Sequence, residues 1–163
     1  MHKPASLREA LTAALPEIAR DPERLVMVVG SGTIINTGTK ALSWEYRYTL
    51  QVIVLDWASH ADAIIAPMLM WAKRNQPELF DNPEKRERAL RFNAEFLSTT
   101  TVDLALEIDL TEAVLARPRE GQPGALNLIH KPEPPYPGAE LQAEHWELYI
   151  QDKKVGEWDY DPR

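Results

Sequence analysis

The chain has 163 residues, of which 44% are apolar and 26% are charged, and this is the size and balance of one globular domain with at most a small appendage. Such a composition excludes an intrinsically disordered or fibrous protein. The absence of cysteine excludes disulfide frameworks, thiolate metal sites and cysteine nucleophiles, and is typical of a cytosolic protein. No window of about 18 uninterrupted apolar residues occurs, so we expect neither a membrane span nor a secretory segment.

The net charge of −7 disfavours a general nucleic-acid binder, because affinity for phosphate backbones is built mainly from clustered lysine and arginine. The acidic excess belongs to the second part of the chain. Residues 1–97 carry 12 basic and 12 acidic side chains, whereas residues 98–163 carry 6 basic and 13 acidic ones. This distribution indicates a solvated or partner-facing surface in the C-terminal part.

The first predicted element is a helix over residues 6–20, with Ser6 at its N-cap and leucines and isoleucine at helical spacing. Pro16 lies inside this range and is expected to kink or divide the helix. A short buried strand follows at residues 25–29. The glycines of Gly30-Ser31-Gly32 are expected to end this strand in a turn.

The strongest strand signal covers residues 44–56, where apolar and polar side chains alternate as far as Ile53. From Ile53 and Leu55 onward both faces are apolar, which predicts cover on both sides of this end of the strand. An apolar stripe at helical spacing predicts a helix over residues 60–76, kinked at Pro67, as one of the covering elements.

Two further alternating patterns predict strands at residues 89–97 and 101–109, and their short connection predicts antiparallel pairing. The second strand is expected to continue as an extended segment to residue 117. The charged segment 78–88 is expected to form a loop with at most one helical turn. The predicted fold class is therefore α+β, with an antiparallel or mixed sheet flanked by two main helices.

Residues 118–144 are rich in proline and glycine, and four prolines within residues 132–137 predict a stiff, extended connector. Alternating aromatic and aliphatic residues then predict a β-hairpin. The sequence thus divides into a core at residues 1–117, a connector at 118–144, and a C-terminal hairpin and tail at 145–163.

This hairpin carries the candidate partner-binding residues. An isolated two-stranded hairpin is marginal in water, so one this apolar must dock on something. It either folds back on its own sheet or adds to the sheet edge of a neighbouring subunit or another protein, and the sequence leaves both open. The candidate contact residues are Trp146, Leu148, Tyr149, Ile150 and Trp158.

Motifs for catalysis and for cofactors are weak, and we predict no catalytic residue, no cofactor and no metal site. The four histidines are scattered without ligand spacing. Asp103, Glu107 and Asp109 share one strand face and could serve general acid–base chemistry, but alternation places them on the solvent side. An aromatic stripe at Trp44, Tyr46 and Tyr48 resembles a base-stacking platform; since it has few cations nearby, we expect it to pack on the helices.

Several segments together resemble one known family, the tail completion protein R family of temperate phages with contractile tails. The most specific segment is the strand at residues 47–57, RYTLQVIVLDW, whose alternation breaks into an apolar run and ends in an acid and a tryptophan. The other similar segments are residues 3–12, 71–77, 147–150 and 158–159.

The resemblance implies a structural virion protein, not an enzyme, that completes the tail. It implies a sheet flanked by helices and a homo-oligomer, a six-membered ring that caps the tail tube and the last sheath ring and faces the neck or connector proteins. Such a ring would lie at the neck end of the virion tail after assembly in the bacterial cytoplasm. DNA would pass through it without specific binding.

Other functions remain open at this stage. The chain could be a neck adaptor or a tail assembly factor that is not retained as a terminator ring, and the particle could be a phage or a headless tail-like bacteriocin. A more remote alternative is a small enzyme that uses the three surface carboxylates.

Overall fold

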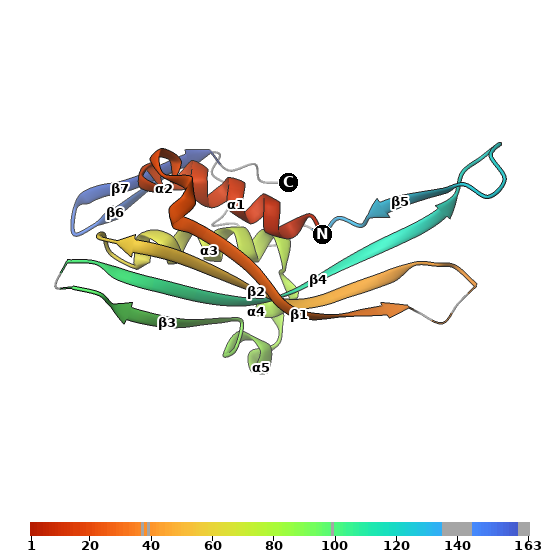
Figure 1. Cartoon of the computed structure of the whole chain (residues 1–163), viewed down its shortest axis with the longest axis horizontal. Helices are drawn as coiled ribbons and strands as arrows, with labels where there is room; N and C mark the ends of the chain where they lie inside the picture. The colour runs from red at the N-terminus through yellow and green to blue at the C-terminus, as the bar shows by residue number, and fades with distance from the viewer. Residues whose placement is uncertain (37, 39, 99, 135–144, 160–163) are drawn as a thin grey trace.

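The computed structural model describes residues 1–36, 38, 40–98, 100–134 and 145–159 of the chain. It confirms an α+β fold, with the two main helices over one face of an antiparallel sheet and a separate C-terminal β-hairpin (Figure 1). The helical elements are α1 (Lys3–Ala14), α2 (Pro16–Arg20), η1 (Pro22–Arg24), α3 (Asp62–Asn75), α4 (Glu78–Asp81) and α5 (Pro83–Arg86). The strands are β1 (Leu25–Asn36), β2 (Trp44–Trp57), β3 (Leu90–Phe96), β4 (Val102–Pro118), β5 (Leu126–His130), β6 (His145–Ile150) and β7 (Lys153–Asp159).

The main sheet has five strands, and its longest strand, β4, carries two partners along one edge. Four strands follow the order β1-β2-β4-β3, and β5 also pairs with β4. All pairings are antiparallel. β3 pairs with residues 102–108 of β4 and β5 with residues 114–118. Residues 109–113 of this edge therefore have no partner strand within the described part of the chain.

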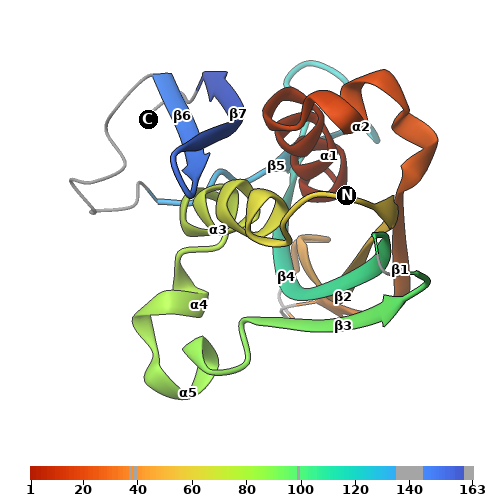
Figure 2. The same cartoon turned by 90° about the vertical axis from the view of Figure 1, so that its left-hand side faces the viewer.

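One face of the sheet, which we call the inner face, holds the core. Alternate residues of β2 and β4 point to it, because side chains in a strand alternate between the two faces. α1 and α3 lie side by side over this face (Figure 2). The buried inner-face residues are Tyr48, Leu50, Val52, Val54, Leu104, Leu106, Ile108 and Leu110.

The N-terminal helix begins earlier than predicted and is divided. α1 starts at Lys3, so Ser6 is not its N-cap; the Ser6 hydroxyl instead accepts a hydrogen bond of 3.0 Å from Trp71 Nε1. The helix ends at Ala14, and Leu15 is extended, because Pro16 cannot donate the next backbone hydrogen bond; Pro16 becomes the first residue of α2.

The predicted turn at Gly30-Ser31-Gly32 is wrong, because β1 continues through these residues to Asn36. A register shift between Val29 and Gly32 absorbs the irregularity as a bulge. A Cβ atom at Gly32 would lie 2.9 Å from Tyr48 Cβ, so glycine is needed where the strand passes this side chain. The two glycines therefore belong to a strand rather than ending it.

Two other expectations need correction. The segment 78–88 holds two short helices, α4 and α5, rather than a loop with at most one turn. Ile53 and Leu55 are only half-buried, so β2 does not enter a layer that buries both of its faces. By contrast, β4 does extend through residue 117, as predicted.

The C-terminal hairpin docks on its own core. β7 contacts α1, and Leu148, Ile150 and Trp158 pack against the core cluster. A Cβ atom at Gly156 would lie 2.7 Å from the Ala14 carbonyl oxygen, which shows how closely the hairpin backbone approaches α1. Residues 135–144 of the predicted connector lie outside the described residues, and β5 falls within its first part, so the three-part division of the chain stays a prediction. No helix in the described residues is long and apolar enough to cross a membrane.

Candidate partner-binding surfaces

The five hairpin residues predicted to bind partners do not lie in one environment. Leu148, Ile150 and Trp158 are half-buried against the core. Trp146 is also half-buried and lies opposite Trp158 in the hairpin register. Tyr149 points away and is 53% exposed, and its hydroxyl donates a 3.2 Å hydrogen bond to Glu147 Oε2. Only Tyr149 of the five is therefore freely accessible at the surface.

A second candidate surface lies where the strands run past the helices. The β1–β2 and β4–β5 hairpins both project from the same end of the molecule, at the right of Figure 1. They expose large apolar side chains where no helix covers them. We call this surface the arm surface and define it by Ile34, Leu42, Leu126 and Leu128. Ile35 and Ile129 of the same hairpins are also exposed but lie on the opposite face of the sheet.

The third surface lies at the opposite end of the sheet, on β3. Phe92 and Phe96 stand opposite Leu106 and Val102 of β4, so they belong to the inner face, as the alternation predicts. The helices do not cover them, however, and they are 72% and 80% exposed. With Leu97, which is also exposed, they form what we call the β3 surface.

Sequence reasoning did not identify these two end surfaces. The arm surface was not predicted because the glycines and prolines of residues 30–39 and 118–144 are typical of a turn and a connector rather than of strands. The short apolar run of residues 126–129 was the available signal for β5. For β3 the alternation was recognised, but whether a helix covers a strand depends on tertiary packing that no local pattern records.

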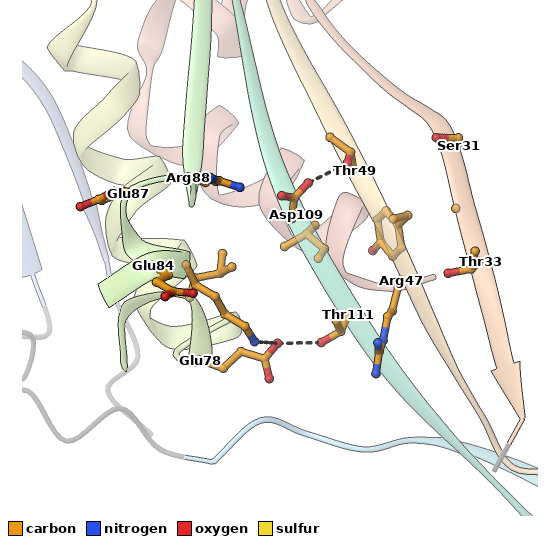
Figure 3. Close-up of a pocket in the computed structure, with 15 residues that line it drawn as sticks. Ser31, Thr33, Arg47, Thr49, Glu78, Glu84, Glu87, Arg88, Asp109 and Thr111 are labelled. Carbon is orange, nitrogen blue, oxygen red and sulfur yellow. Dashed lines mark hydrogen bonds and ion pairs between the residues drawn. The ribbon is translucent and has the colours of Figure 1, made fainter. Parts of the chain in front are cut away.

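A pocket of about 930 Å³ lies between the outer face of the sheet and α4–α5 (Figure 3). Its lining is polar and carries both signs of charge. Thr49 donates a 2.6 Å hydrogen bond to Asp109, and Glu78 is contacted by Lys85 at 3.9 Å and by the Thr111 hydroxyl at 3.5 Å. The cations Arg47, Lys85 and Arg88 are balanced by Glu78, Glu84, Glu87 and Asp109, so the pocket has no excess of positive charge to hold a phosphate.

The three strand carboxylates lie on the outer face, as predicted. Arg91 donates to both oxygens of Asp109, at 2.9 and 3.0 Å, and to Glu107 at 3.3 Å. The hydrogen bonds from Arg91 lower the pKa of Asp109 below its ordinary value, although partial burial opposes them. Asp103 accepts a 2.8 Å hydrogen bond from the backbone N–H of Asp56. A paired carboxylate with a lowered pKa is unsuited to act as a general acid at neutral pH.

An exposed cluster on the hairpin has the composition of a metal site. Ligand atoms of His145, Glu147 and Glu157 lie within 4.8 Å of one another. The Lys154 ammonium, however, donates to both Glu147 and Glu157, and these hydrogen bonds raise the pKa of Lys154. A cation of the chain itself therefore neutralises these carboxylates.

A buried polar cluster joins the N-terminus to β4. Glu112 lies on the inner face, and its carboxylate accepts hydrogen bonds from the backbone N–H groups of His2 (2.6 Å) and Lys3 (3.4 Å) and from the Tyr48 hydroxyl. Burial raises the pKa of Glu112, but these hydrogen bonds outweigh burial and the pKa is lowered overall. The ionised carboxylate thus stands at the N-terminus of α1, which has no side-chain cap of its own.

Gln76 fills the gap between β3 and β5 on the edge of β4. Its side chain is fully buried, and its oxygen accepts hydrogen bonds from Lys3 Nζ (2.6 Å) and from the backbone N–H of Thr111 (3.1 Å). Its nitrogen donates to the Thr111 hydroxyl (2.8 Å) and to Glu78 (3.0 Å). A side chain therefore satisfies a strand N–H that no neighbouring strand reaches.

A sheet whose two main helices cover only the middle of one face, with exposed apolar surfaces at both ends, is typical of a small structural protein that contacts other subunits. Residues 1–134 match the family model described as P2 phage tail completion protein R (GpR), and the chain belongs to this family. The resemblance inferred from the sequence is therefore confirmed. The family is one of phage tail structural proteins rather than enzymes, so the chain is a protein of the virion tail with a role in tail completion.

The chain is also similar to tail completion protein R of Escherichia phage P2. The two are 36% identical over 159 residues, which cover 98% of this chain and 99% of that protein. The similarity therefore extends past residue 134 and includes the C-terminal hairpin. No solved structure matches the chain.

Proposed function

We propose that the chain terminates the tail by forming a closed, six-membered ring that caps the tail tube. Its membership of a tail completion family supports this role. In this position the ring also contacts the last sheath ring and forms the tail side of the head–tail junction, where it meets the neck or connector proteins.

One observation carries the ring proposal: the arm surface and the β3 surface are unlike and lie at opposite ends of one chain. A ring is built from heterologous contacts, in which each subunit presents one surface to the subunit before it and a different surface to the subunit after it. Two unlike apolar surfaces at opposite ends meet this requirement.

We assign the tail-facing contacts in part to the C-terminal hairpin. Tyr149 is its accessible aromatic residue, whereas Leu148, Ile150 and Trp158 hold the hairpin on the core. We expect Tyr149→Ala to weaken attachment to tails without changing the melting temperature. Trp158→Ala, a matched loss of one aromatic ring, is expected to lower the melting temperature instead. If the Tyr149 variant attached to tails as strongly as the wild type, the hairpin would not be part of the tail contact.

The proposed ring lets DNA pass without holding it. Because the chain carries a net charge of −7, its overall charge repels the phosphate backbone. We therefore expect no tight binding of duplex DNA at physiological salt, measured by fluorescence anisotropy. Strong, salt-sensitive binding would argue for a different role at the junction.

Light scattering of the purified chain, alone and with short polymerised tail tubes, tests the proposed function, together with imaging of where the chain binds. A ring of about six subunits, or a monomer that forms one cap at a tube end, supports the terminator role. A monomer that ignores tube ends favours a neck adaptor or an assembly factor. Presence in purified particles would then distinguish the adaptor from the factor.

A further inference from the structure

We propose that the arm surface of one copy docks on the β3 surface of the next copy, and that this contact closes the ring. The inference rests on the proposed ring function and specifies which residues join its subunits. It makes a second copy of this chain, rather than the tube or sheath protein, the partner of both end surfaces.

The β3 surface exposes aromatic side chains that would otherwise belong to a core. Phe92 and Phe96 continue the inner face of the sheet, which is buried under helices one strand away. Because a folded monomer rarely leaves two phenylalanine rings on one face of a strand in water, the exposed pair indicates a surface that another protein covers. β3 is also an edge strand, so the contact can include its free backbone groups.

The arm surface offers a complementary apolar patch. Leu126 and Leu128 lie on the same face as the buried residues Val114 and Ala116, but beyond the reach of the helices. Ile34 of β1 pairs with Tyr46, so it also lies on this face and is exposed. β5, like β3, is a short strand at an edge of the sheet.

The two ends carry opposite charge, which is why a second copy fits better than an unrelated partner. Residues 114–131 of the arm contain three cations, Arg117, Arg119 and Lys131, against one carboxylate, Glu120. Residues 92–104 around the β3 surface contain Glu95 and Asp103 and no lysine or arginine. The chain as a whole is acidic, so a positive arm is a local feature that matches the negative β3 end of its own copy.

The charged groups at both ends are available for such a contact. Arg117, Arg119 and Glu95 are exposed, and none of them makes a side-chain hydrogen bond or ion pair within the described residues. Opposite charges around an apolar centre set the orientation of a contact and exclude the like pairing of arm with arm. The contact is therefore head-to-tail, as a ring requires.

Charge reversal tests the contact. The arm variant Arg117→Glu with Arg119→Glu makes the arm negative, and the end variant Asn93→Lys with Glu95→Lys makes the β3 end positive. We expect each variant to cap tail tubes at least about 10-fold more weakly than the wild type, because like charges then face each other. The combined variant, in which both charges are swapped, is expected to recover capping. Glu9→Lys, an exposed reversal on α1 rather than at either end, is the matched control and is expected to cap normally.

Mixing the two single-end variants gives a second, independent readout. In a mixture, the unchanged arm of the end variant meets the unchanged β3 end of the arm variant, and the reversed arm meets the reversed β3 end. Both contacts are then complementary, so the two variants can alternate around a closed ring. We expect tube imaging to show few caps with either variant alone and complete caps with the equimolar mixture. Recovery both in the combined variant and in the mixture supports the proposal, and failure of the mixture contradicts it.

The outcomes separate this contact from the ring function itself. If the wild-type chain caps tubes and both reversed variants cap them equally well, the contact is wrong while the ring function stands. A second outcome is that neither the reversed variants nor the combined variant caps tubes, although the combined variant keeps the wild-type melting temperature. In that case the charges contact another protein, and the second-copy contact is also wrong. If the wild-type chain never binds tube ends, the ring function fails first.

Discussion

Glu112 ties the first residues of the chain to the middle of its longest strand. Its carboxylate serves as a cap for α1 although it comes from β4, more than a hundred positions away in the sequence. The even-numbered residues of β4 from Leu104 to Ala116 are otherwise apolar and buried. A single charged residue among the buried apolar positions of a strand indicates a buried polar contact. The spacing of residues in the sequence, however, could not identify the groups that Glu112 contacts.

We expect Glu112→Gln to lower the free energy of unfolding by roughly 2 kcal/mol at pH 7, because the variant loses the charge that strengthens three hydrogen bonds. The pKa of Glu112 is lowered in the folded state, so its stabilisation is present above the ordinary value of 4.5 and is lost as pH falls through the folded pKa. The difference between wild type and variant should therefore shrink in acid. Urea unfolding followed by tryptophan fluorescence between pH 3 and 7 measures it, with Glu23→Gln as an exposed control. A constant difference across this range would contradict the assignment.

The buried side chain of Gln76 leads to a second prediction about stability, which is independent of Glu112. Replacement by leucine keeps much of the volume but leaves the Thr111 N–H without its acceptor, and the Lys3 ammonium keeps only its ion pair with Glu133 (2.8 Å). We expect Gln76→Leu to cost about 3 kcal/mol, since unpaired buried donors lose their hydration without compensation. Gln51→Leu, on the outer face of β2, is the control and should change stability little. Thermal unfolding of the wild type and the two variants measures the effect. If all three proteins had equal melting temperatures, water would have replaced the Gln76 amide.

At the scale of elements, the contact between β7 and α1 depends on a glycine. A methyl group at Gly156 cannot be accommodated without moving the hairpin away from the Ala14 carbonyl. We expect Gly156→Ala to loosen the hairpin while the five-stranded sheet stays folded, visible as faster amide exchange in β6 and β7 and a red shift of tryptophan fluorescence. Gly30→Ala is the matched control, because its added carbon meets no atom within 4 Å. If amide exchange in β6 and β7 were unchanged in the Gly156 variant, α1 rather than the hairpin would have moved to make room for the methyl group.

The sequence was informative where a pattern is local. The alternation along β2 and β4 defined both strands, their faces and the antiparallel pairing with β3, because strand periodicity follows directly from backbone geometry. The same pattern predicted that Asp109 faces solvent. It could not show that Arg91 pairs with Asp109, since that contact joins two strands whose relative register is set by the whole sheet.

Glycine and proline account for the errors. Gly30 and Gly32 were interpreted as a turn, but they permit a bulged strand to pass Tyr48. Gly121 and Gly124 do have positive φ and form a turn, yet the chain then returns to the sheet as β5. Local composition indicates where the chain can bend, but it does not indicate whether the segment after the bend pairs with the sheet again. The candidate hairpin residues were recognisable from their apolar alternation, whereas their division between core and surface was not.

At the scale of the whole molecule, the exposed apolar residues at the two ends of the sheet make the proposed association of subunits testable through stability. If association through these ends occurs only in the folded state, it stabilises the fold by mass action. We therefore expect the melting temperature to rise with protein concentration over a 100-fold range. The double variant Phe92→Ser with Phe96→Ser should show no such rise, while Tyr149→Ser should behave like the wild type. A concentration-independent melting temperature for all three would show that the free chain does not associate.

β4 runs without interruption from its pairing with β3 to its pairing with β5, and its 17 residues extend over roughly 55 Å. One continuous strand thus connects the two ends through which neighbouring subunits would pull on each other. Tension around such a ring would act along β4, parallel to its length, while its hydrogen bonds to β2 lie across the direction of pull. Many of these bonds would have to break together rather than one after another, so the strand would act as a mechanical tie between neighbouring subunits of the proposed ring.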